Sequence, residues 1–354
     1  MKKRVTIYDI AEQTGFSVGT VNRALNDKTR ISPATKQKIM DTAERLGYKV
    51  NPAAQGLRRS PITIGAILFC PIEEYVDSII DGIYSAATDL EKYNVSVDVR
   101  KINYTNSRDC LNKTSKIIKE FSDNNYNGVV LFLSSMIDEL RDIAVLIDEM
   151  TPKNMFFATV ANDIPDSDRV IHVGVDAFMA GKMAAQLLEL SCSGKNVALL
   201  VTSNSSPVNT LYIKGFMEYS KNNLFASVKI YEHYDNEAQI IAATKQMLRE
   251  IPTLSGIYMT TAASSIACKF IKDLGKKDLC IITTDLLSET PDILAQKTAA
   301  AAIFQNPYRQ GRNVVKYLYQ YITTKTCEGV YLIPPHILFS SNLSPYLDKK
   351  QIDT

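Results

Sequence analysis

A short polar stretch near the N-terminus carries side chains suited to contacts with nucleic acid. Ser17, Thr20, Asn22 and Arg23 lie within one segment of seven residues. An arginine fork can bond the O6 and N7 atoms of a guanine, whereas hydroxyls and amides suit phosphate oxygens. We therefore expect Arg23 to read a base and the other three side chains to contact the DNA backbone.

From Ile62 onward, the sequence contains no recognisable catalytic motif. It has no GxGxxG after a strand, no GxxxxGK[ST] and no GxSxG, and the Gly-Lys pair within 193–200 lacks the upstream glycine of a phosphate-binding loop. The three histidines, His172, His233 and His336, are far apart and form no HExxH or HxH pattern. A binding protein without a cofactor is therefore favoured over an enzyme.

The cysteine pattern does not indicate a metal site either. The chain has six cysteines: Cys70, Cys110, Cys192, Cys268, Cys280 and Cys327. No two of them form a CxxC pair, and most lie within apolar runs. We expect free, buried thiols with neither disulfides nor bound metal.

The polar stretch falls on the second of three helices expected in the N-terminal region. Thr6 can cap a first helix that Gly15 ends. Ser17 can cap a second helix over 18–25, and Ser32 followed by proline is typical of the start of a third. Two short helices joined by a tight turn predict a helix-turn-helix.

The apolar spacing of these helices decides which side chains face outward. The expected core consists of Ile10, Val21, Leu25, Ile39 and Leu46. This core leaves Val18, Gly19, Asn22 and Arg23 on the outer face of the second helix, where a recognition helix faces the major groove.

The net charge of +2 hides an asymmetry along the chain. Residues 1–60 contain 12 Lys and Arg against 5 Asp and Glu, a net of +7, so the remaining residues carry a net of −5. A basic head on an acidic body is typical of nucleic-acid binding. The alternative is a three-helix module that binds another protein, and the charge together with the polar outer face favours DNA.

Residues 53–58 can form a helix of about two turns between the head and the body. Asn51 can cap this helix and Pro52 can open it. The helix is too short to be stable alone, and Gly56 weakens it further. We expect it to form on docking, and an ordinary flexible linker is the alternative.

From Ile62 the chain alternates short apolar strands with helices. The expected strands are 62–69, 95–102, 128–134, 154–161, 196–202, 228–234, 256–261, 278–285 and 299–304. The expected helices include 77–93, 179–190, 209–221, 238–249 and 308–323. This alternation predicts parallel sheets covered by helices, and about 280 residues exceed one such sheet. Two subdomains with a ligand cleft between them, beyond the carboxyl ends of the strands, are expected.

Nothing in the sequence indicates a membrane protein. No apolar run approaches the roughly 18–20 residues of a membrane span. The basic N-terminus lacks the apolar stretch of a secretory signal, because Asp9 and Glu12 interrupt it. We expect a cytoplasmic protein without a membrane partner.

The stretch VTIYDIAEQTGFSVGTVNRALNDKTRISPATKQKIMDTAERLGYKVNPAAQGLRR resembles the headpiece of the lactose/galactose repressor family. The resemblance implies base reading by Val18, Gly19 and Arg23. It also implies a hinge helix in the minor groove, where Leu57 wedges a base step. The expected DNA contacts are Thr6, Ser17, Val18, Gly19, Thr20, Asn22, Arg23, Asn26, Ala54, Gln55, Leu57 and Arg58.

The body resembles the effector domain of that family, which is similar to periplasmic sugar-binding proteins. The stretches GVDAFMAGKMAAQLL, SGIYMTTAASSIACKFIKDLG, IITTD and AAIFQNPYRQGRNVVKYL carry this resemblance. It implies three crossings between subdomains, near Asn162, 286–294 and 325–331. The expected organisation is a headpiece (1–50), a hinge (51–61), an effector domain (62–343) and a tail (344–354), the last without a coiled-coil heptad. Within the effector domain, the expected N-subdomain is 62–162 with 295–325, and the C-subdomain is 163–290 with 331–343.

The same resemblance implies a set of ligand-binding residues. Asp285 and Gln305 follow strands and match positions that bind ligand hydroxyls, and Asp163 is expected to do so at the first crossing. The full expected set is Tyr75, Asp163, Asn209, Tyr212, Thr261, Asp285 and Gln305. Asp176 and Asn306 precede helices and are interpreted as N-caps.

One position departs from the family pattern. The family commonly has an arginine three residues before the glycine of the Gly215–Phe216 pair, and this chain has Tyr212 there. A tyrosine offers one hydroxyl and a ring in place of a forked donor, and Asn209 can compensate only in part. Glu73 and Glu74 also lie beside the expected cleft. We therefore expect an uncharged sugar or polyol, not a phosphorylated ligand.

The sequence thus predicts a three-helix helix-turn-helix headpiece and hinge helix followed by two doubly wound parallel-sheet subdomains. The resemblance implies a sequence-specific transcription regulator, a repressor, that binds a pseudo-palindromic operator as a homodimer under the control of a small effector. A nucleobase-type corepressor and a DNA-binding α/β sugar-modifying enzyme remain as alternatives. A transport binding protein is disfavoured by the missing signal and by the headpiece.

Overall fold

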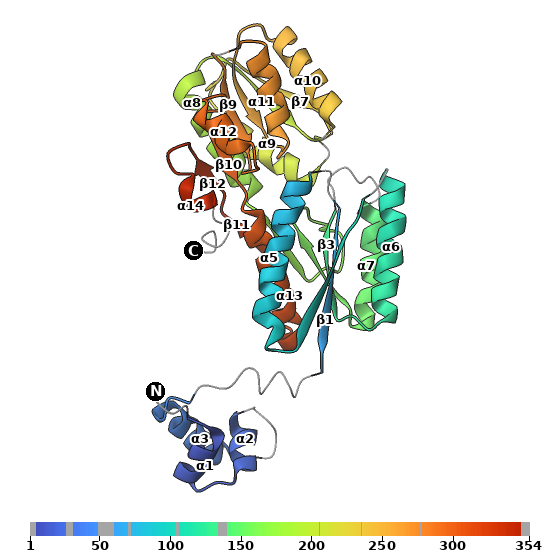
Figure 1. The fold of residues 1–354 in the computed structure, drawn as a ribbon, viewed down its shortest axis with the longest axis vertical. Coiled ribbons are helices and arrows are strands. Elements are labelled where there is room, and N and C mark those ends of the chain that lie inside the picture. The colour runs from blue at the N-terminus through green and yellow to red at the C-terminus, as the bar shows by residue number, and fades with distance from the viewer. Residues whose placement is uncertain are drawn as a thin grey trace. The chain divides into compact units, whose positions relative to one another are not determined.

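The computed structural model describes residues 5–25, 31–48, 60–69, 72–103, 106–133, 140–204, 206–234, 236–276 and 278–347. The chain divides into two compact units, Met1–Ser60 and Pro61–Thr354. Within the described residues, the first unit contains three helices and the second contains two α/β lobes (Figure 1). Within the described ranges, no helix is both long enough and apolar enough to cross a membrane.

The N-terminal unit is a three-helix bundle around a small apolar core. Its helices are α1 (Ile7–Thr14), α2 (Val18–Leu25) and α3 (Pro33–Arg45). Thr6 and Asp9 form the capping box of α1, and Gly15 ends that helix in the left-handed conformation. The side chains of Ile10, Val21 and Ile39 are fully buried between the helices. These features confirm the predicted helix-turn-helix.

The first lobe of the second unit is built on a six-stranded parallel sheet in the order β11-β5-β4-β3-β1-β2. Its strands are β1 (Ile62–Leu68), β2 (Val95–Lys101), β3 (Gly128–Phe132), β4 (Phe156–Val160), β5 (Ile171–Val175) and β11 (Gly329–Ile333). Its helices are α5 (Glu73–Glu91), α6 (Ser107–Asp123), α7 (Leu140–Met150) and α13 (Pro307–Thr324). The α5–α13 pair and the α6–α7 pair cover opposite faces of this sheet (Figure 1).

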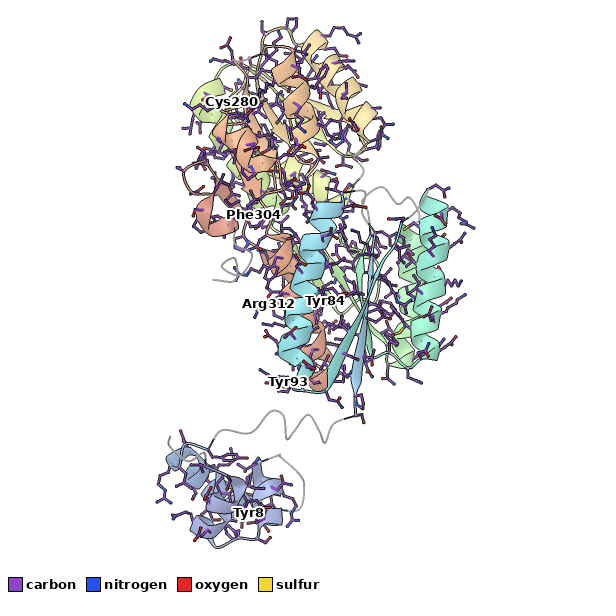
Figure 2. The ribbon with its side chains drawn as sticks, in the orientation of Figure 1. Tyr8, Tyr84, Tyr93, Cys280, Phe304 and Arg312 are labelled. Atoms are coloured by element: carbon purple, nitrogen blue, oxygen red, sulfur yellow. The ribbon has the colours of Figure 1, made fainter. Side chains whose placement is uncertain are left out.

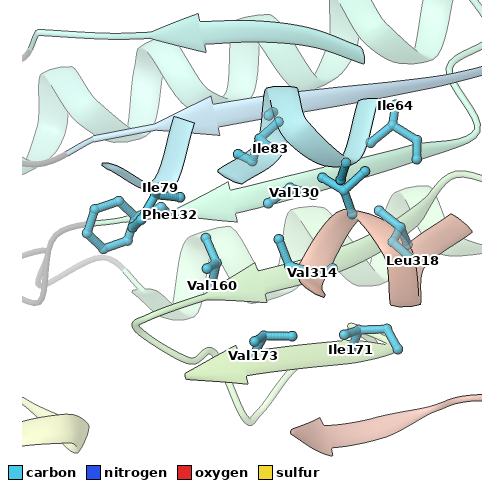
Figure 3. Close-up of a cluster of buried hydrophobic side chains, with 14 of the residues drawn as sticks. Ile64, Ile79, Ile83, Val130, Phe132, Val160, Ile171, Val173, Val314 and Leu318 are labelled. Atoms are coloured by element: carbon cyan, nitrogen blue, oxygen red, sulfur yellow. The ribbon is translucent and has the colours of Figure 1, made fainter. Parts of the chain in front are cut away.

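Alternate residues of β1 show why the strands of this lobe read as continuous apolar runs. Ile64 and Leu68 point toward α5 and α13, whereas Ile67 packs against α6 and α7 on the other face. Val314 and Leu318 of α13 lie over the sheet on the first of these faces (Figure 3). A parallel sheet covered on both faces has no polar side, so its strands lack polar alternation.

The second lobe repeats this architecture with a six-stranded sheet in the order β12-β10-β9-β8-β6-β7. Its strands are β6 (Asn196–Val201), β7 (Ser227–Glu232), β8 (Leu254–Met259), β9 (Cys280–Thr284), β10 (Ala301–Phe304) and the antiparallel β12 (His336–Leu338). Its helices are α8 (Ala177–Cys192), α9 (Pro207–Tyr219), α10 (Glu237–Glu250), α11 (Ser264–Asp273), α12 (Thr290–Ala295) and α14 (Ser344–Leu347). Helices α8 and α9 cover one face, and α10 to α12 cover the other.

In each lobe, a glycine lets one pair of helices come into backbone contact: Gly82 in the first lobe and Gly215 in the second. A Cβ added at Gly82 of α5 would lie 2.0 Å from the Tyr308 carbonyl oxygen of α13. A Cβ added at Gly215 of α9 would lie 2.0 Å from the Phe178 carbonyl oxygen of α8. No side chain fits at either contact, so glycine permits the close approach of the two helices.

The chain crosses between the lobes at places that differ from the sequence prediction. The crossings lie at Asp176, at Gln305–Asn306 and at Pro334–Pro335, because β5 and β11 pair within the first sheet while β6, β10 and β12 belong to the second. The predicted crossings near 162, 286–294 and 325–331 are wrong, and the predicted subdomain boundaries shift with them. The strand β5 escaped prediction because His172 and Gly174 interrupt its apolar run.

Candidate DNA-binding surface and ligand site

The exposed side of α2 carries a chain of hydrogen-bonded polar side chains. The Ser17 and Thr20 hydroxyl oxygens are 2.9 Å apart, and Arg23 Nη2 donates to Thr20 Oγ1 over 3.2 Å. Ser17, Gly19 and Arg23 are exposed, and Val21 and Ala24 are buried on the opposite side. The arginine fork is therefore held in an outward position by its own helix.

Three of the sequence-predicted DNA contacts also pack or bond within the headpiece, and their contacts to DNA stay predictions. Val18 was expected on the outer face, but it is half-buried and packs against the core of the headpiece, because it lies near the buried edge of α2. Asn22 is also half-buried, and the Thr6 hydroxyl is engaged in the α1 capping box. Asn26, Ala54, Gln55, Leu57 and Arg58 lie outside the described residues.

In the second lobe, Asp285 and Gln305 meet at the carboxyl ends of two adjacent strands. Each follows its strand directly, and β9 and β10 are parallel neighbours. The Asp285 carboxylate accepts hydrogen bonds from the Gln305 backbone N–H over 3.0 Å and from Gln305 Nε2 over 2.7 Å. Asp285 has a φ of 68°, in the left-handed region that few aspartates adopt. This conformation turns the chain at the edge of the sheet, where ligands bind in α/β folds.

Tyr212 extends this pair into a polar chain across the lobe. Its hydroxyl donates to Gln305 Oε1 over 2.9 Å, although α9 and β10 are far apart in sequence. The ring of Tyr212 meets the Tyr258 ring edge-on, with centroids 6.3 Å apart. A tyrosine, an amide and a carboxyl group thus stand in one hydrogen-bonded series at the position that the family resemblance assigns to ligand binding.

Burial determines the pKa values of the two ionisable groups in this hydrogen-bonded series, Asp285 and Tyr212. Asp285 is completely buried, and this burial raises its pKa to about 7, against the opposing effect of the hydrogen bonds from Gln305. Burial likewise raises the pKa of Tyr212, which stays a neutral hydroxyl. Among the described residues, no cation contributes to the shift at Asp285. A ligand that donates hydroxyl hydrogens suits this site, whereas an anionic ligand would meet a carboxylate without a counter-charge.

The two remaining predicted ligand residues of the second lobe, Asn209 and Thr261, are also buried and hydrogen-bonded. Asn209 Oδ1 accepts from Thr260 Oγ1 over 2.7 Å, and Thr261 Oγ1 accepts from the Ala263 backbone N–H over 3.0 Å. All three polar side chains are buried: Asn209 lies on α9, and Thr260 and Thr261 directly follow β8.

Tyr75 contributes from the first lobe. It is buried at the start of α5 and its ring lies 5.9 Å from the Phe132 ring. Its hydroxyl is close enough to Tyr212 to add to the rise in the Tyr212 pKa. Tyr75 and Tyr212 therefore approach each other from the two lobes.

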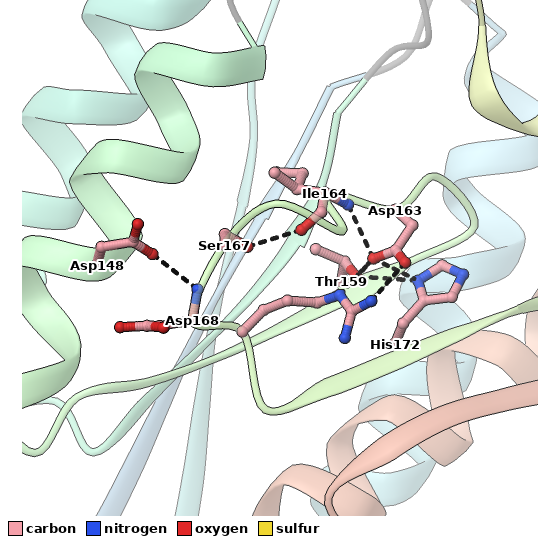
Figure 4. A network of polar contacts seen from close by, with 8 residues as sticks. Asp148, Thr159, Asp163, Ile164, Ser167, Asp168 and His172 are labelled. Atoms are coloured by element: carbon pink, nitrogen blue, oxygen red, sulfur yellow. Dashed lines mark hydrogen bonds and ion pairs between the residues drawn. The ribbon is translucent and has the colours of Figure 1, made fainter.

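Asp163 does not belong to this set. Its carboxylate accepts from Arg169 Nε over 2.5 Å and Nη2 over 2.6 Å, from Thr159 Oγ1 over 2.9 Å and from the Ile164 backbone N–H (Figure 4). It also lies 3.4 Å from His172 Nδ1. Burial raises its pKa, but the hydrogen bond and charge of Arg169 outweigh this effect and the pKa is lowered. Arg169 thus occupies both carboxylate oxygens, and the ligand contact expected of Asp163 stays a prediction.

The sequence did not reveal several residues at the site. Gln310 of α13 is fully buried and donates from Nε2 to the Gln305 carbonyl oxygen over 2.9 Å. Within the described part of the chain, Gln310 Oε1 and the buried Ser206 Oγ have no hydrogen-bond partner. Such atoms are destabilising unless a ligand or water satisfies them. A glutamine within a helix and a serine before one give no sequence signal that separates them from ordinary helix residues.

A second missed feature connects the lobes directly. Glu74 at the start of α5 accepts from the Ser288 backbone N–H and from Ser288 Oγ, each over 2.7 Å. Leu287 and Ala262 of the second lobe pack against the apolar cluster of the first. This contact joins residues 214 positions apart in the sequence, so no local pattern could have predicted it.

Comparison with known proteins agrees with this two-part architecture. The description "Bacterial regulatory proteins, lacI family" matches residues 6–51, and "Periplasmic binding protein domain" matches residues 67–326. The chain belongs to the lacI family of regulators. It is therefore a DNA-binding transcriptional regulator with a ligand domain of the sugar-binding type.

Relatives cover almost the whole regulator. Catabolite control protein A of Priestia megaterium is 24% identical over 342 residues, which cover 94% of this chain and 97% of the relative. The HTH-type transcriptional regulator pepR1 of Lactobacillus delbrueckii subsp. lactis is 24% identical over 343 residues, which cover 95% and 97%. Both relatives match the headpiece and the ligand domain together.

Solved structures resemble the fold of the ligand domain. The glucose-galactose binding protein GanP of Geobacillus stearothermophilus superposes with a TM-score of 0.70 at 22% identity, covering 80% of this chain and 99% of that protein. An ABC transporter solute binding protein from Burkholderia graminis C4D1M, in complex with D-arabinose, gives a TM-score of 0.69 at 18% identity, covering 80% and 97%. These likenesses show that the two-lobed fold is that of the binding proteins.

Proposed function

We propose that this lacI-family regulator binds an uncharged polyhydroxy ligand, a sugar or a polyol, at the Tyr212–Gln305–Asp285 chain. The observation that carries the proposal is a buried carboxyl at the carboxyl edge of the second sheet, with two hydrogen bonds and no counter-charge from the described residues. A carboxyl in this setting accepts hydroxyl hydrogens, and the nearby amides and hydroxyls supply both donors and acceptors. Catalysis has no place in the proposal.

Two further features support this ligand class. Tyr212 replaces the forked donor that an anionic ligand would favour, and its ring presents an apolar face of the kind that covers the C–H side of a sugar. Ser206 Oγ and Gln310 Oε1, unpartnered among the described residues, could receive ligand hydroxyls. The solved relatives that share the fold include a glucose-galactose binding protein and a complex with D-arabinose.

The headpiece is proposed to act as one half of a homodimer on a pseudo-palindromic operator. Arg23 is exposed and held outward by Thr20, in a position to bond a guanine through both guanidinium nitrogens. Ser17 and Thr20 suit phosphate contacts on the same helix. The proposed outcome is repression, relieved when the ligand alters the arrangement of the lobes.

The coupling between ligand and operator is proposed to run through the contact between the lobes. Glu74 and Ser288 bridge the lobes close to Tyr75, the first-lobe residue nearest Tyr212. A ligand held between Tyr75 and Tyr212 would have different affinities for open and closed arrangements. A difference of this kind is what linkage requires for a ligand to change DNA affinity.

A panel of sugars, polyols, sugar phosphates and nucleobases, screened by thermal unfolding, tests the ligand class. A ligand present at about 100 times its dissociation constant stabilises the folded state by about 2.7 kcal/mol. Asp285→Ala should remove the shift given by any sugar or polyol, while the exposed control Asp273→Ala should keep it. A shift given only by phosphorylated sugars or only by nucleobases, or one that survives Asp285→Ala, contradicts the proposed ligand.

Selection of DNA sites from random sequence, followed by binding assays, tests the headpiece. Arg23→Ala should weaken binding and relax preference at one base position, with a discrimination loss of about 1–3 kcal/mol. Arg45→Ala removes the same charge from an exposed position on α3 and should leave base preference unchanged. Equal effects of the two substitutions would show that Arg23 acts only through its charge.

A further inference from the structure

Two cysteines of the second lobe meet across the end of α8 and the start of β9. Cys192 is the last residue of α8. Cys280, labelled in Figure 2, is the first residue of β9. Both belong to the apolar cluster that α8 and α9 form against the sheet. They are 88 positions apart in the sequence, and no CxxC pattern connects them.

A glycine on the intervening strand allows the two thiols to approach. Gly256 of β8 pairs with Cys280 in the parallel ladder, so side chains at both positions point to the same face of the sheet. A Cβ at Gly256 would lie only 2.8 Å from Cys192 Sγ, so the Cys192 thiol fills the space that a side chain there would take. Cys192 Sγ also lies 3.3 Å from the Ser255 carbonyl oxygen, on the residue before Gly256. The Cys192 sulfur is thus placed beside Cys280 on the neighbouring strand.

The two thiols have different environments. Cys192 is buried, with 1% of its surface exposed, whereas Cys280 is only half-buried. A hydrogen bond from Cys192 lowers the pKa of Cys280 to about 7, burial opposes this effect, and Ser191 supports it. The hydrogen bond to Cys280, together with burial, raises the pKa of Cys192. An accessible, acidic thiol next to a second thiol is typical of a redox-sensitive pair.

We propose that Cys192 and Cys280 form a reversible disulfide when the regulator meets a hydroperoxide. Cys280 releases its proton, and the thiolate attacks the hydroxyl-bearing oxygen of the hydroperoxide. The O–O bond breaks, Cys280 becomes a sulfenic acid, and the leaving alkoxide takes up the proton that Cys280 released, to form an alcohol. The Cys192 thiol then loses its proton and its sulfur attacks the Cys280 sulfur. The S–O bond breaks, and the departing hydroxide takes that proton to become water. Two thiols are oxidised to one disulfide, and the hydroperoxide is reduced to an alcohol and water.

The bond would connect two elements that reach the ligand site. Helix α8 begins beside Asp176, where the chain crosses between the lobes, and Asp285 directly follows β9. A disulfide between the opposite ends of these elements would restrict the second lobe without occupying the ligand site. We therefore expect oxidation to raise the thermal stability of the full-length protein, because a cross-link reduces the freedom of the unfolded chain.

Peptide mapping of full-length protein treated with tert-butyl hydroperoxide tests the proposal. Oxidation should lower the number of titratable thiols in unfolded protein from six to four and yield a linked peptide pair containing Cys192 and Cys280. Dithiothreitol should restore all six thiols. A linked pair containing any other cysteine, or no linked peptide after treatment, would overturn the proposal.

Single substitutions separate the attacking thiol from the resolving one. Cys192→Ser should leave Cys280 as the oxidised residue and let it proceed to sulfinic acid, because no neighbouring thiol remains to intercept the sulfenic acid. Cys280→Ser should protect Cys192 from oxidation. Cys268→Ser alters a buried thiol in the other apolar cluster of the lobe and should leave the linked pair intact. Equal oxidation of Cys280 and Cys268 in the wild-type protein would contradict the assigned roles.

Discussion

Replacing Asp285 by asparagine should remove a large pH dependence of stability. The carboxyl is completely buried, and its pKa is raised from 3.8 to about 7. An asparagine has the same shape, and rotation of the Gln305 amide lets the two amides pair while Gln305 Nε2 faces the Tyr212 hydroxyl. The variant therefore keeps the packing of the site and loses only the ionisable group.

The sign and size of the effect follow from the two pKa values. Between pH 4 and pH 7 the folded state holds the Asp285 proton more tightly than the unfolded state does, so the stabilisation present below about pH 4 is lost as the pH rises through about 7. Each pKa unit corresponds to about 1.4 kcal/mol, so the complete loss is on the order of 4 kcal/mol. About 2–3 kcal/mol of this loss should fall between pH 5 and pH 8.

Urea unfolding of the wild type and of Asp285→Asn at several pH values measures this effect. The difference between the two proteins at each pH isolates Asp285, because every other titrating group is common to both. The wild type should lose about 2–3 kcal/mol relative to the variant between pH 5 and pH 8. A difference that stays constant over this range would show that Asp285 is ionised without penalty, and the description of the site as a buried, uncompensated carboxyl would be wrong.

Three further predictions concern other contacts. Gly82→Ala should destabilise the protein by about 1–3 kcal/mol in urea unfolding, because the new Cβ would lie 2.0 Å from the Tyr308 carbonyl oxygen; an unchanged midpoint would refute the close helix contact. Glu74→Ala should shift the ligand-free protein toward an open arrangement, because it loses both hydrogen bonds to Ser288. Small-angle scattering should then give a larger radius of gyration than for the wild type, and identical profiles would exclude this contact as a latch. Burial lowers the pKa of His172 from 6.5 to about 4, so the unfolded chain takes up this proton first as the pH falls. The free energy of unfolding of the wild type should therefore drop by about 3 kcal/mol relative to that of His172→Asn between pH 6.5 and pH 4. Unfolding free energies that change in parallel for the two proteins over this range would contradict the prediction.

Local features of the fold were predictable from the sequence. Thr6 and Gly15 mark the ends of α1, and Asp176 and Asn306 cap α8 and α13 as predicted, because capping depends on residues within one turn. The pairing of Asp285 with Gln305 was within reach as well, since both follow strands whose carboxyl ends share one edge. Helix caps, and side chains that meet where neighbouring parallel strands end, can therefore be predicted from the sequence alone.

Features that depend on distant contacts were not predictable. The strand β5 contains His172 and Gly174, and only its place between β4 and β11 shows that it belongs to the first sheet. Asp163 had the sequence signal of a ligand contact, a polar residue after a strand, but Arg169 folds back to pair with it. The contact of Glu74 with Ser288 joins two lobes and left no pattern in either segment.

The central claim is that one ligand site controls operator binding, and operator affinity with and without ligand tests it most directly. The operator would come from selection out of random DNA, and the ligand from the thermal screen. Fluorescence anisotropy at fixed salt should show that the ligand changes the wild-type Kd for the operator by about tenfold or more, a coupling of about 1.4 kcal/mol. Asp285→Ala should have the operator Kd of the ligand-free wild type, and adding the ligand should leave this Kd unchanged. A ligand that stabilises the wild type but leaves its operator Kd unchanged would contradict the account.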